Sequence, residues 1–298
     1  MMKAFTPSAP TVVLGSFDGV HLGHRALLRS AAEQGGPVIV YTFSTLPHAA
    51  AALTLPADRE RLLSELGADE VVFDSFDSVR ALTPEQFVDR VLIDRLGAKG
   101  AVCGFNYRFG AAASGDTALL SALLAARGRE CLVVEAVQED GAPISSSRIR
   151  ALVQSGEMER AEALLGRPFF YRLPVLQGKQ LGRRIGIPTA NQRIPATLVT
   201  PPSGVYAAVA AHRGRLYPAV TNLGMRPTVN TDAADITLES HLIGFEGDLY
   251  REELTVSLLS HLRPESRFPD LAALRAQIDR DMLSARSITQ RYLARRSK

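Results

Sequence analysis

The chain has 298 residues, a hydrophobic fraction of 46%, a charged fraction of 22% and a formal net charge of +3 at pH 7. This length predicts two domains, and the composition is that of globular proteins with a buried core. The small net charge, without a long run of Lys and Arg, argues against a nucleic-acid-binding surface, so we predict no nucleic-acid partner.

The two cysteines, Cys103 and Cys131, each lie in an apolar segment and outside any C-x-x-C spacing. This pattern favours buried free thiols over a disulfide and argues against a zinc site. No segment has the ~20 consecutive apolar residues of a membrane span, and the N-terminus lacks the layout of a signal peptide. We therefore predict a cytoplasmic protein without a membrane partner, either a monomer or a weak homo-oligomer.

In chain order, the first part alternates strand-like and helix-like segments. Predicted strands cover Thr11–Gly15, Val38–Phe43, Glu70–Phe73, Ala101–Gly104 and Cys131–Val134, and predicted helices cover His24–Glu33, Arg59–Leu66, Pro84–Leu96 and Thr117–Ala126. Apolar strands separated by helices predict an α/β domain with a parallel sheet covered on both faces. Ligands bind such sheets beyond the carboxyl ends of the strands, where Gly15, Phe43 and Gly104 lie.

From about Gly166 onward, short strand-like runs are separated by turns that contain Pro and Gly. Predicted strands cover Gly204–Ala211, Leu216–Thr221, Asp235–Ile243 and Glu253–Leu259, and a terminal helix covers Leu271–Leu293. This pattern predicts an antiparallel β-barrel after the α/β domain. We place the two domains at residues 1–165 and 166–298, with the boundary after a helix that carries Ser155–Leu164.

The segment Gly15–His24 follows the first predicted strand and has the residues of a phosphate site. Gly15 permits a sharp turn, Asp18-Gly19 supplies a second turn, and His21 and His24 lie three apart at a helix start, so they share one side. Free N–H groups and the positive end of the helix dipole favour phosphate there. A His-x-x-His pair could also bind a metal ion or be a pair of exposed residues.

Two later segments have residues that suit the same chemistry. Ile144–Arg150 places the hydroxyls of Ser145, Ser146 and Ser147 and the guanidinium of Arg148 at a helix start, where they suit phosphate oxygens, although a serine-rich helix cap is the alternative. Gly104–Gly110 combines an amide with several aromatic side chains, and a turn with aromatic packing is its alternative reading.

In the second half, Gly178–Asn191 is rich in glycine and basic residues. Its glycines permit close approach of the backbone to phosphates, and Thr189 and Asn191 offer neutral oxygens that Mg²⁺ accepts. The predicted ATP-binding residues are Gly178, Lys179, Gly182 and Arg183. A glycine-rich hairpin without a ligand remains the alternative.

The segment Gly15–His24 resembles the G-x-F-D-G-x-H-x-G-H signature of the nucleotidyltransferase superfamily of Rossmann-like folds. The resemblance implies that His21 and His24 hold the phosphates of ATP and that no covalent enzyme intermediate forms. Ile144–Arg150 resembles the I-S-S-[ST]-R-I-R motif of the same family. The residues that the resemblance assigns to ATP are Gly15, Phe17, Asp18, Gly19, Ser145, Ser146 and Ser147, with Arg148 beside His21 and His24 as a catalytic residue.

Gly104–Gly110, with Gly115-Asp116 after it, resembles the flavin-adenylyltransferase version of this family. The resemblance implies that the flavin is bound by Asn106, Tyr107, Phe109 and Asp116. The family commonly has F-D-P-H-P after its second strand, whereas this chain has a different sequence at Ser44–Ala49.

The second half resembles the riboflavin kinase family through several separate strings. They are Gly178–Asn191 with its G-x-P-T-A-N end, Gly204-Val205-Tyr206, Asn222–Thr228, Leu238–Leu242, Asp248–Tyr250 and Leu262–Phe268. The resemblance implies that Glu239 is the general base for the ribityl 5′-hydroxyl. His241 alternates onto the same strand face as Glu239, and we expect His212 and His261 on the surface.

From Thr11 to about Ala285, the chain therefore resembles the bacterial bifunctional riboflavin kinase/FMN adenylyltransferase family. This resemblance implies two Mg²⁺-dependent reactions with ATP, from riboflavin to FMN and from FMN to FAD. Two alternatives stay open. One is an adenylyltransferase for another small phosphate with a flavin-binding barrel, which the intact Pro188–Asn191 string and Glu239 argue against. The other is a non-catalytic flavin or nucleotide sensor, which predicts loss of His21, His24 or Glu239, all of which are present.

Overall fold

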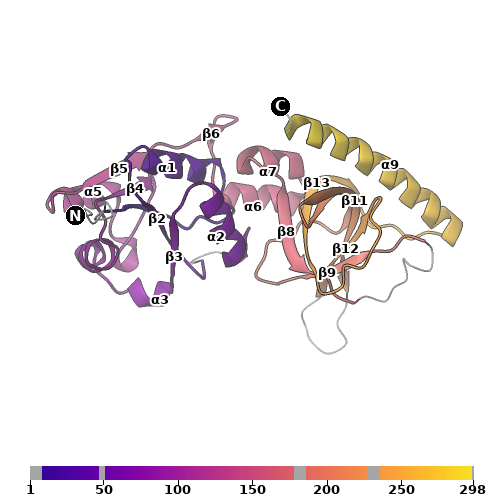
Figure 1. Cartoon of the computed structure of the whole chain (residues 1–298), viewed down its shortest axis with the longest axis horizontal. Helices are drawn as coiled ribbons and strands as arrows, with labels where there is room; N and C mark the ends of the chain where they lie inside the picture. The colour runs from indigo at the N-terminus through magenta and orange to yellow at the C-terminus, as the bar shows by residue number, and fades with distance from the viewer. Residues whose placement is uncertain (1–8, 47–50, 178–185, 227–234, 297–298) are drawn as a thin grey trace, which may run out of the picture. The chain divides into compact units, whose positions relative to one another are not determined.

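The computed structural model describes residues 9–46, 51–177, 186–226 and 235–296. The chain divides into two compact units, Met1–Ser146 and Ser147–Lys298 (Figure 1). The domain boundary at residues 165 and 166 stays a prediction. Within the described ranges, no helix is long and apolar enough to cross a membrane.

The first unit is built around a parallel five-stranded sheet with the strand order β3-β2-β1-β4-β5. Its strands are β1 (Thr11–Leu14), β2 (Val38–Phe43), β3 (Glu70–Asp74), β4 (Gly100–Gly104) and β5 (Glu130–Val134). The α-helices are α1 (Leu22–Ala32), α2 (Pro56–Glu65), α3 (Phe76–Val79), α4 (Pro84–Gln86) and α5 (Thr117–Ala125). A π-helix (η1, Phe87–Arg95), a 3₁₀ turn (η2, Ala111–Ala113) and a hairpin of β6 (Gln138–Glu139) and β7 (Ala142–Pro143) complete the unit.

The order of these strands determines where a ligand can bind. The chain runs from β1 outward to β2 and β3, and then crosses back to place β4 on the other side of β1. Ligands of open parallel sheets bind at such a switch point, beyond the carboxyl ends of the two strands. The segments that follow β1 and β4 at this point are Gly15–His21 and Phe105–Gly110, which are two of the three segments singled out in the sequence of this unit.

Local sequence explains the helix that precedes β4. Thr83 caps its start, because its hydroxyl accepts from the backbone N–H of Gln86 at 3.2 Å and the Gln86 side chain accepts from the N–H of Thr83 at 3.1 Å. Pro84 occupies the first turn as predicted, and Gly97, with a φ of 62°, follows the end. The helix differs from the prediction in its winding, because only its first turn is α-helical and the rest is the π-helix η1.

The second unit begins with two helices, α6 (Ser146–Ser155, whose first residue closes the first unit) and α7 (Met158–Leu165). A single helix was predicted to carry Ser155–Leu164, and that prediction was wrong in this detail. Gly156 has a φ of 81°, a left-handed conformation that ends α6 before α7 begins. Gly166, with a φ of 71°, ends α7 in the same way.

A six-stranded antiparallel barrel follows, with the strand order β8-β13-β10-β11-β12-β9. The strands are β8 (Phe169–Pro174), β9 (Ala190–Ile194), β10 (Gly204–His212), β11 (Arg215–Arg226), β12 (Asp235–Leu242) and β13 (Glu253–Arg263). Gln192 helps to close the barrel, because its buried amide donates to the carbonyls of Leu173 on β8 and Leu254 on β13 at 2.7 and 2.8 Å. Strands β8 and β9 were not predicted.

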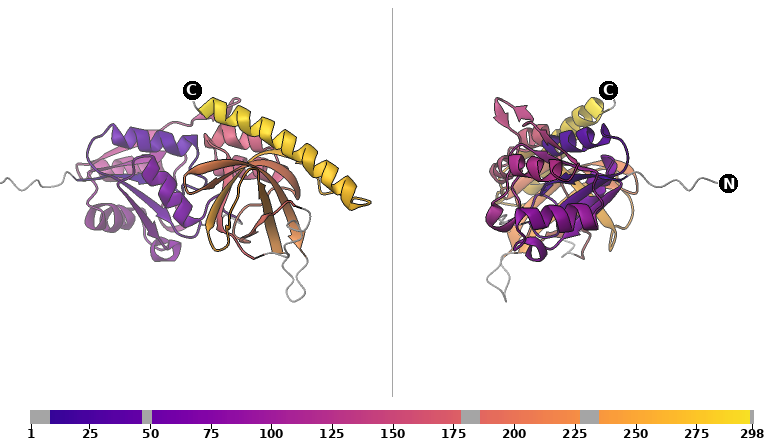
Figure 2. Two further views of the ribbon diagram at one scale, coloured as in Figure 1. Left: turned by 45° about the vertical axis from the view of Figure 1, so that its right-hand side comes forward. Right: turned by 90° about the vertical axis from the view of Figure 1, so that its left-hand side faces the viewer.

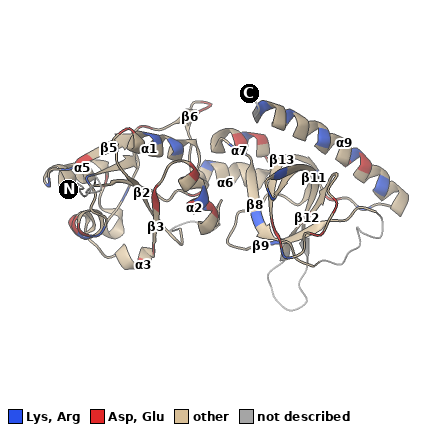
Figure 3. Cartoon of the chain, in the orientation of Figure 1, with Lys and Arg blue, Asp and Glu red and all other residues tan. Residues whose placement is uncertain are grey.

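Helix α9 (Leu271–Arg296) lies along the outside of the barrel (Figure 2). Its buried Ala285 packs against Val205, Ala207 and Val220 of the barrel, and the Thr289 hydroxyl donates to the carbonyl of Ala208. Basic and acidic residues are interspersed along this helix (Figure 3). The helix therefore covers one side of the barrel and contributes residues to the pocket described below.

Candidate functional sites

The loop after β1 is held in an unusual backbone conformation by burial. Phe17 is fully buried although its φ is 51°, a value that residues other than glycine rarely adopt. Its ring takes the space in which a side chain at position 15 would lie, since a Cβ on Gly15 would be 3.2 Å from the ring. The packing of the Phe17 ring therefore favours glycine at position 15.

Asp18 fastens this loop to the segment before α2. Its Oδ1 accepts from the backbone N–H groups of Leu53 and Thr54 at 2.8 and 3.3 Å, and the residue is 1% exposed. The Thr54 hydroxyl in turn accepts from the N–H of Gly19 at 3.2 Å. The Ser146 hydroxyl donates to the Asp18 carbonyl at 2.8 Å, which brings the start of α6 to the same loop.

His21 and His24 form the N-terminal cap of α1. The backbone N–H of His24 donates to Nδ1 of His21 at 3.4 Å, and the N–H of His21 donates to Nδ1 of His24 at 3.3 Å. The two rings are stacked, with centroids 3.6 Å apart. Because an accepting Nδ1 carries no proton, each neutral ring must carry its proton on Nε2.

The electrostatics keep both imidazoles neutral near pH 7. Burial lowers the pKa of His21 to about 4. The pKa of His24 is also well below its ordinary value, first because of burial, then because of His21 and then because of the positive charge of Arg59. The pair can therefore offer two N–H donors to an anion at neutral pH, but it does not add positive charge.

Gly23 is the residue that allows this stacked pair. A Cβ at position 23 would lie 3.0 Å from Cε1 and 3.1 Å from Nδ1 of His21. A side chain there would push the His21 ring away from the helix start. The position of the His21 ring therefore explains why a glycine stands between the two histidines.

An aromatic pocket of about 710 Å³ lies in the first unit near the end of β4. The rings of Tyr107 and Phe109 line it and are nearly parallel, with an interplanar angle of 9° and centroids 6.0 Å apart. Other lining residues come from β2, α3, η1 and the segment after Phe109; they are Phe43, Phe76, Val79, Arg80, Phe87, Arg108, Gly110, Ala112 and Ala113. Its size and stacked rings suit a flat aromatic ligand.

Two of the residues predicted to contact the flavin are not part of the aromatic pocket. Asp116 caps α5 by accepting from the N–H of Leu119 at 2.9 Å, and it lies 3.9 Å from the Arg108 guanidinium. Asn106 is exposed in the turn after β4. Neither residue is among those that line the aromatic pocket.

In the barrel, three strands bring polar residues side by side. Glu239 on β12 is the register partner of Asn191 on β9 and of Asn222 on β11. Directly opposed residues of antiparallel strands have side chains on one face, with Cβ atoms about 4.5–5.5 Å apart. Glu239, Asn222, Thr189 and His241 also line a common pocket of about 410 Å³. The Nδ1 atom of His241 is 2.8 Å from the carbonyl of Pro188 and links β12 to the segment before β9.

The far wall of this pocket comes from β13, the segment after it and α9. The Arg263 guanidinium forms three hydrogen bonds to Asp281 of α9, from Nη2 to Oδ2 at 2.9 Å and from Nε to Oδ2 and Oδ1 at 3.1 and 3.3 Å. Glu265 accepts from the Asn222 amide at 3.0 Å. The remaining lining residues are mostly apolar and include Ile187, Val205, Val220, Phe268, Leu274 and Ile278.

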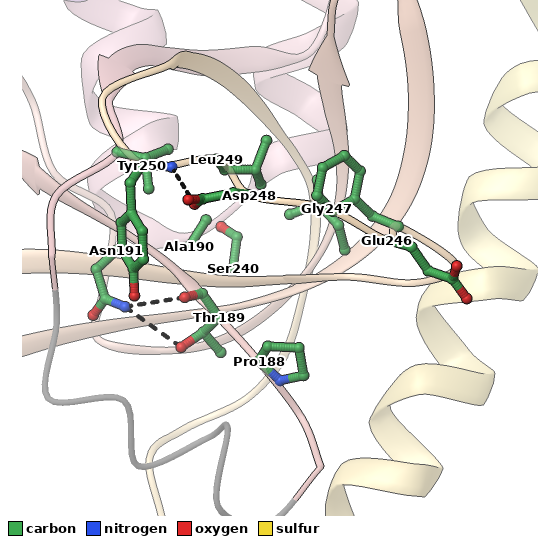
Figure 4. A pocket seen from close by; sticks show the side chains of 13 residues that line it. Pro188, Thr189, Ala190, Asn191, Ser240, Glu246, Gly247, Asp248, Leu249 and Tyr250 are labelled. Atoms are coloured by element: carbon green, nitrogen blue, oxygen red, sulfur yellow. Dashed lines mark hydrogen bonds between the residues drawn. The ribbon is translucent and has the colours of Figure 1, made fainter.

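A second pocket of the barrel, of about 330 Å³, adjoins the first at Thr189 (Figure 4). The Asn191 amide nitrogen donates to the carbonyl and hydroxyl oxygens of Thr189 at 3.2 and 3.5 Å, and this directs the nitrogen of the amide, rather than its oxygen, toward Thr189. The segment Phe245–Tyr250 forms the opposite wall. Within the described ranges, no cluster of three or more His, Cys, Asp or Glu residues could hold a metal ion.

Comparisons with known proteins match the two halves of the chain to two different families. A family model described as FAD synthetase matches residues 5–148, and one described as riboflavin kinase matches residues 165–289. The bifunctional riboflavin kinase/FMN adenylyltransferase of Pseudomonas fluorescens is 37% identical over 287 residues, which are 92% of this chain and 91% of that protein. The protein of the same description from Escherichia coli K12 is 38% identical over 288 residues, with the same two coverages.

The chain belongs to the bifunctional riboflavin kinase/FMN adenylyltransferase family. A crystal structure described as a macrolide-efflux protein from Streptococcus pneumoniae also resembles this chain, with a TM-score of 0.82 and 30% identity. The likeness covers 95% of this chain and 96% of that one. The family assignment confirms the resemblance inferred from the motifs.

Apart from the flavin residues described above, the predicted site residues fall into four groups. The structure brings Gly15, Phe17, Asp18, Gly19, His21, His24 and Ser146 together around one loop, and it brings Glu239, Thr189 and Asn191 together at the adjoining barrel pockets. Ser145, Ser147 and Arg148 flank Ser146 at the start of α6. Gly178, Lys179, Gly182 and Arg183 lie outside the described residues.

Several lining residues had not been assigned a role from the sequence. Three of them belong to motifs that the sequence analysis named, but no contact between these motifs could be inferred; they are Asn222, Arg263 and Glu265. His212 and His261, expected on the surface, are both partly buried: the His212 side chain is 10% exposed beside Glu252, and the His261 ring packs 4.8 Å from that of Tyr206. Both cysteines are free, as predicted, with Cys103 buried and Cys131 half-buried.

Proposed function

We propose that the two reactions of this family are performed at two separate sites of the chain. The protein phosphorylates riboflavin to FMN with ATP, and it adenylylates FMN to FAD with a second ATP. The observation that carries this proposal is that each unit holds its own set of polar residues: the histidine cap in the first unit, and the Asn191, Glu239 and Asn222 row in the second.

In the kinase reaction, Glu239 acts as the general base. The ribityl 5′-hydroxyl oxygen attacks the γ-phosphorus of ATP, its proton passes to the Glu239 carboxylate, and ADP leaves. The pocket of about 410 Å³ holds the flavin, since its lining combines Glu239 with apolar side chains such as Val220 and Phe268. His241, through its contact with the carbonyl of Pro188, orients the strand that carries Glu239.

Thr189 and Asn191 fit a Mg²⁺ ion. Both side chains carry an oxygen of the hard kind that Mg²⁺ prefers, once the Asn191 amide is turned so that its oxygen instead of its nitrogen faces Thr189. Mg²⁺ commonly takes few protein ligands beside substrate phosphates, and this small donor set is of that kind. When bound, the ion would neutralise charge on the phosphates of ATP.

In the adenylyl transfer, the FMN phosphate oxygen attacks the α-phosphorus of ATP. The bond to the β-phosphate breaks and pyrophosphate leaves. Because the attacking phosphate is already ionised, no strong base is needed. His21 and His24 donate their Nε2–H groups to phosphate oxygens, while Arg148 and the hydroxyls of the Ser145–Ser147 string hold the same phosphates.

The aromatic pocket of the first unit is the site proposed for the isoalloxazine of FMN. Tyr107 and Phe109 provide the stacking surface, while Asn106 and Asp116 lie in the turn and helix cap beside them. The glycine-rich string with Gly178, Lys179, Gly182 and Arg183 is proposed to bind the ATP of the kinase reaction. We also propose a cytoplasmic location and a monomer or weak homo-oligomer.

The test is an assay of products. The purified chain is incubated with riboflavin, ATP and Mg²⁺, and the flavins are separated by chromatography at several times. We expect FMN to appear first and FAD to follow. Neither product at any pH between 6 and 9 would contradict the proposal, whereas FMN alone would limit the chain to the kinase reaction.

A further inference from the structure

Arg59 of α2 is buried at the place where β1 and β2 end. It is 1% exposed, and its guanidinium lies 5.3 Å from the centre of the Phe73 ring. Nη1 donates to the carbonyl of Ser16 at 2.8 Å, and Nη2 donates to the carbonyl of Ser44 at 3.4 Å. Ser16 is the second residue after β1, and Ser44 is the first residue after β2. The Arg59 side chain therefore joins the ends of two neighbouring strands.

The positive charge of Arg59 is not required for this link alone. In the described part of the chain its hydrogen bonds go to carbonyl groups, and its Nε is buried without a partner. Burying a cation without a directly paired carboxylate is unfavourable, and a neutral donor could hold the same carbonyls. Buried charges of this kind are found more often at functional sites than in ordinary cores.

The nearest charged and titratable groups identify what this cation acts on. Asp18, in the loop after β1, is the carboxylate that favours the charged form of Arg59, while burial lowers the pKa of the guanidinium. On the other side, the positive charge of Arg59 acts on His24, which also faces His21. Asp58, the neighbouring buried carboxylate of α2, lies 3.9 Å from Arg61. The charge of Arg59 therefore interacts with the carboxylate of Asp18 and with the imidazole of His24.

Arg59 also holds Ser44, the first residue after β2. Ser44 is the first residue of the Ser44–Ala49 segment, and its carbonyl is held by Arg59 while its N–H donates to the carbonyl of Asp74 at 3.0 Å. The link from Ser44 through Arg59 to Ser16 connects this segment to the loop that leads to His21. A change at Arg59 would thus disturb both the position and the electrostatic surroundings of the histidine cap.

We propose that Arg59 is a positioning residue for adenylyl transfer: its buried guanidinium fixes the loop before His21 against the end of β2 and holds a positive charge beside His24. The charge favours neutral imidazoles, so that both Nε2–H groups remain donors and the Nδ1 atoms remain acceptors in the cap. This inference rests on the proposed adenylyltransferase function of the first unit. Arg59 itself is too deeply buried to contact the substrate.

The test compares two variants of Arg59 in the full chain with a matched control. Arg59→Gln removes the charge and keeps one N–H donor group. Arg59→Lys keeps the charge but cannot reach both carbonyl groups with two separate donor groups. Arg61→Gln removes a positive charge from the same helix at a side chain that is 37% exposed and bonded to Glu65. FAD formation from added FMN and ATP gives kcat and KM. Hydrogen exchange of the β1 and β2 amides reports whether the first unit is folded, and FMN formation from riboflavin reports on the second unit.

We expect Arg59→Gln to lower the kcat of FAD formation by about 100-fold, with the KM for FMN and the kinase rate each changed less than about three-fold. Arg59→Lys should lower kcat by a smaller factor, and Arg61→Gln should leave it unchanged. The ring protons of His24, assigned with His24→Gln and followed by NMR, should titrate at higher pH in Arg59→Gln than in the unsubstituted chain, because a neighbouring positive charge is gone.

The inference is overturned if a folded Arg59 variant keeps the kcat of FAD formation, or if both variants lose it equally and the titration of His24 does not move. If Arg59→Gln loses the kinase reaction as well, the inference is judged on Arg59→Lys instead, by the kcat of its FAD formation and the titration of its His24. Failure of the proposed function looks different, since the unsubstituted chain would then make no FAD from FMN.

Discussion

The backbone N–H of His21 donates to the His24 ring, and the backbone N–H of His24 donates to the His21 ring. This reciprocal arrangement is a capping box in which imidazoles replace the usual hydroxyl and carboxylate. It fixes the orientation of both rings, their tautomers and their separation before any substrate binds. The residues expected to hold phosphate are therefore also the residues that start helix α1.

The first prediction concerns pH. Both histidines have a lower pKa in the folded state than the ordinary value of 6.5, and that of His21 is about 4. The unfolded chain therefore takes up protons first, so the contribution of the pair to stability is complete above pH 6.5 and is lost as the pH falls toward 4. For His21 alone the loss amounts to about 3 kcal/mol.

Hydrogen exchange of the β1 and β2 amides, measured between pH 5 and 7.5, tests this dependence after correction for the intrinsic exchange rate. The protection of the unsubstituted chain should decrease with decreasing pH, and His21→Gln should flatten the dependence. Equal slopes for the two proteins would contradict the assignment of a lowered pKa to His21.

The second prediction concerns Gly23. Alanine is normally favoured over glycine within a helix by about 1 kcal/mol, but a Cβ here would lie 3.0 Å from the His21 ring. We expect Gly23→Ala to reduce kcat/KM for FAD formation by at least about ten-fold and to leave FMN formation unchanged. Ala32→Gly, at an exposed position of the same helix, controls for helix propensity and should have little effect on either rate.

The third prediction concerns the aromatic pocket. Tyr107 lines it and Phe105, in the same turn, is 45% exposed and is not among its lining residues. Tyr107→Leu should raise the KM for FMN by about ten-fold through loss of ring stacking, while Phe105→Leu should change it little. Steady-state kinetics with FMN as the varied substrate measures this, and equal effects of the two substitutions would speak against a flavin in the pocket.

The fourth prediction concerns the ion pair between β13 and α9. The Asp281 side chain is 6% exposed and that of Arg263 is 19% exposed, so removing one partner leaves the other poorly solvated. We expect Asp281→Asn to destabilise the barrel by about 3 kcal/mol. Arg263→Met combined with Asp281→Leu should cost less than the sum of the single changes.

Hydrogen exchange of the β13 and α9 amides follows the barrel separately from the first unit. Additive effects of the single and double substitutions would mean that Arg263 and Asp281 do not act as a pair. The same variants should raise the KM for riboflavin, because both residues line the pocket that contains Glu239.

The sequence predicted the strands of the parallel sheet well, because buried strands there are continuous apolar runs bounded by turns. Thr83, Pro84 and Gly97 indicated the limits of one helix, but no local signal distinguished its π-helical winding. Strands β8 and β9 were missed, since Phe169–Pro174 and Ala190–Ile194 are short and contain proline or charged residues. Their pairing depends on partners far along the chain.

The candidate sites were predicted where the functional atoms belong to one continuous string, as in His21 and His24. The spacing of these residues indicated a shared helix face, but it gave no sign that each ring caps the other. Contacts between distant strings could not be inferred, and the link from Arg59 to Ser16 and Ser44 is one example. Arg59 was assigned only to the predicted helix Arg59–Leu66, because nothing local reveals its burial.

The central claim is that one chain holds two independent sites, and a crossed pair of substitutions tests it most directly. Glu239→Gln keeps the shape of the side chain but removes the base, and His24→Gln keeps an acceptor for the N–H of His21 and so preserves the helix cap. FMN formation from riboflavin and FAD formation from added FMN are measured for both variants by chromatography. We predict that Glu239→Gln lowers only the first rate, by about 100-fold or more, and that His24→Gln lowers only the second. Loss of both reactions in either folded variant, or retention of both, would contradict the account.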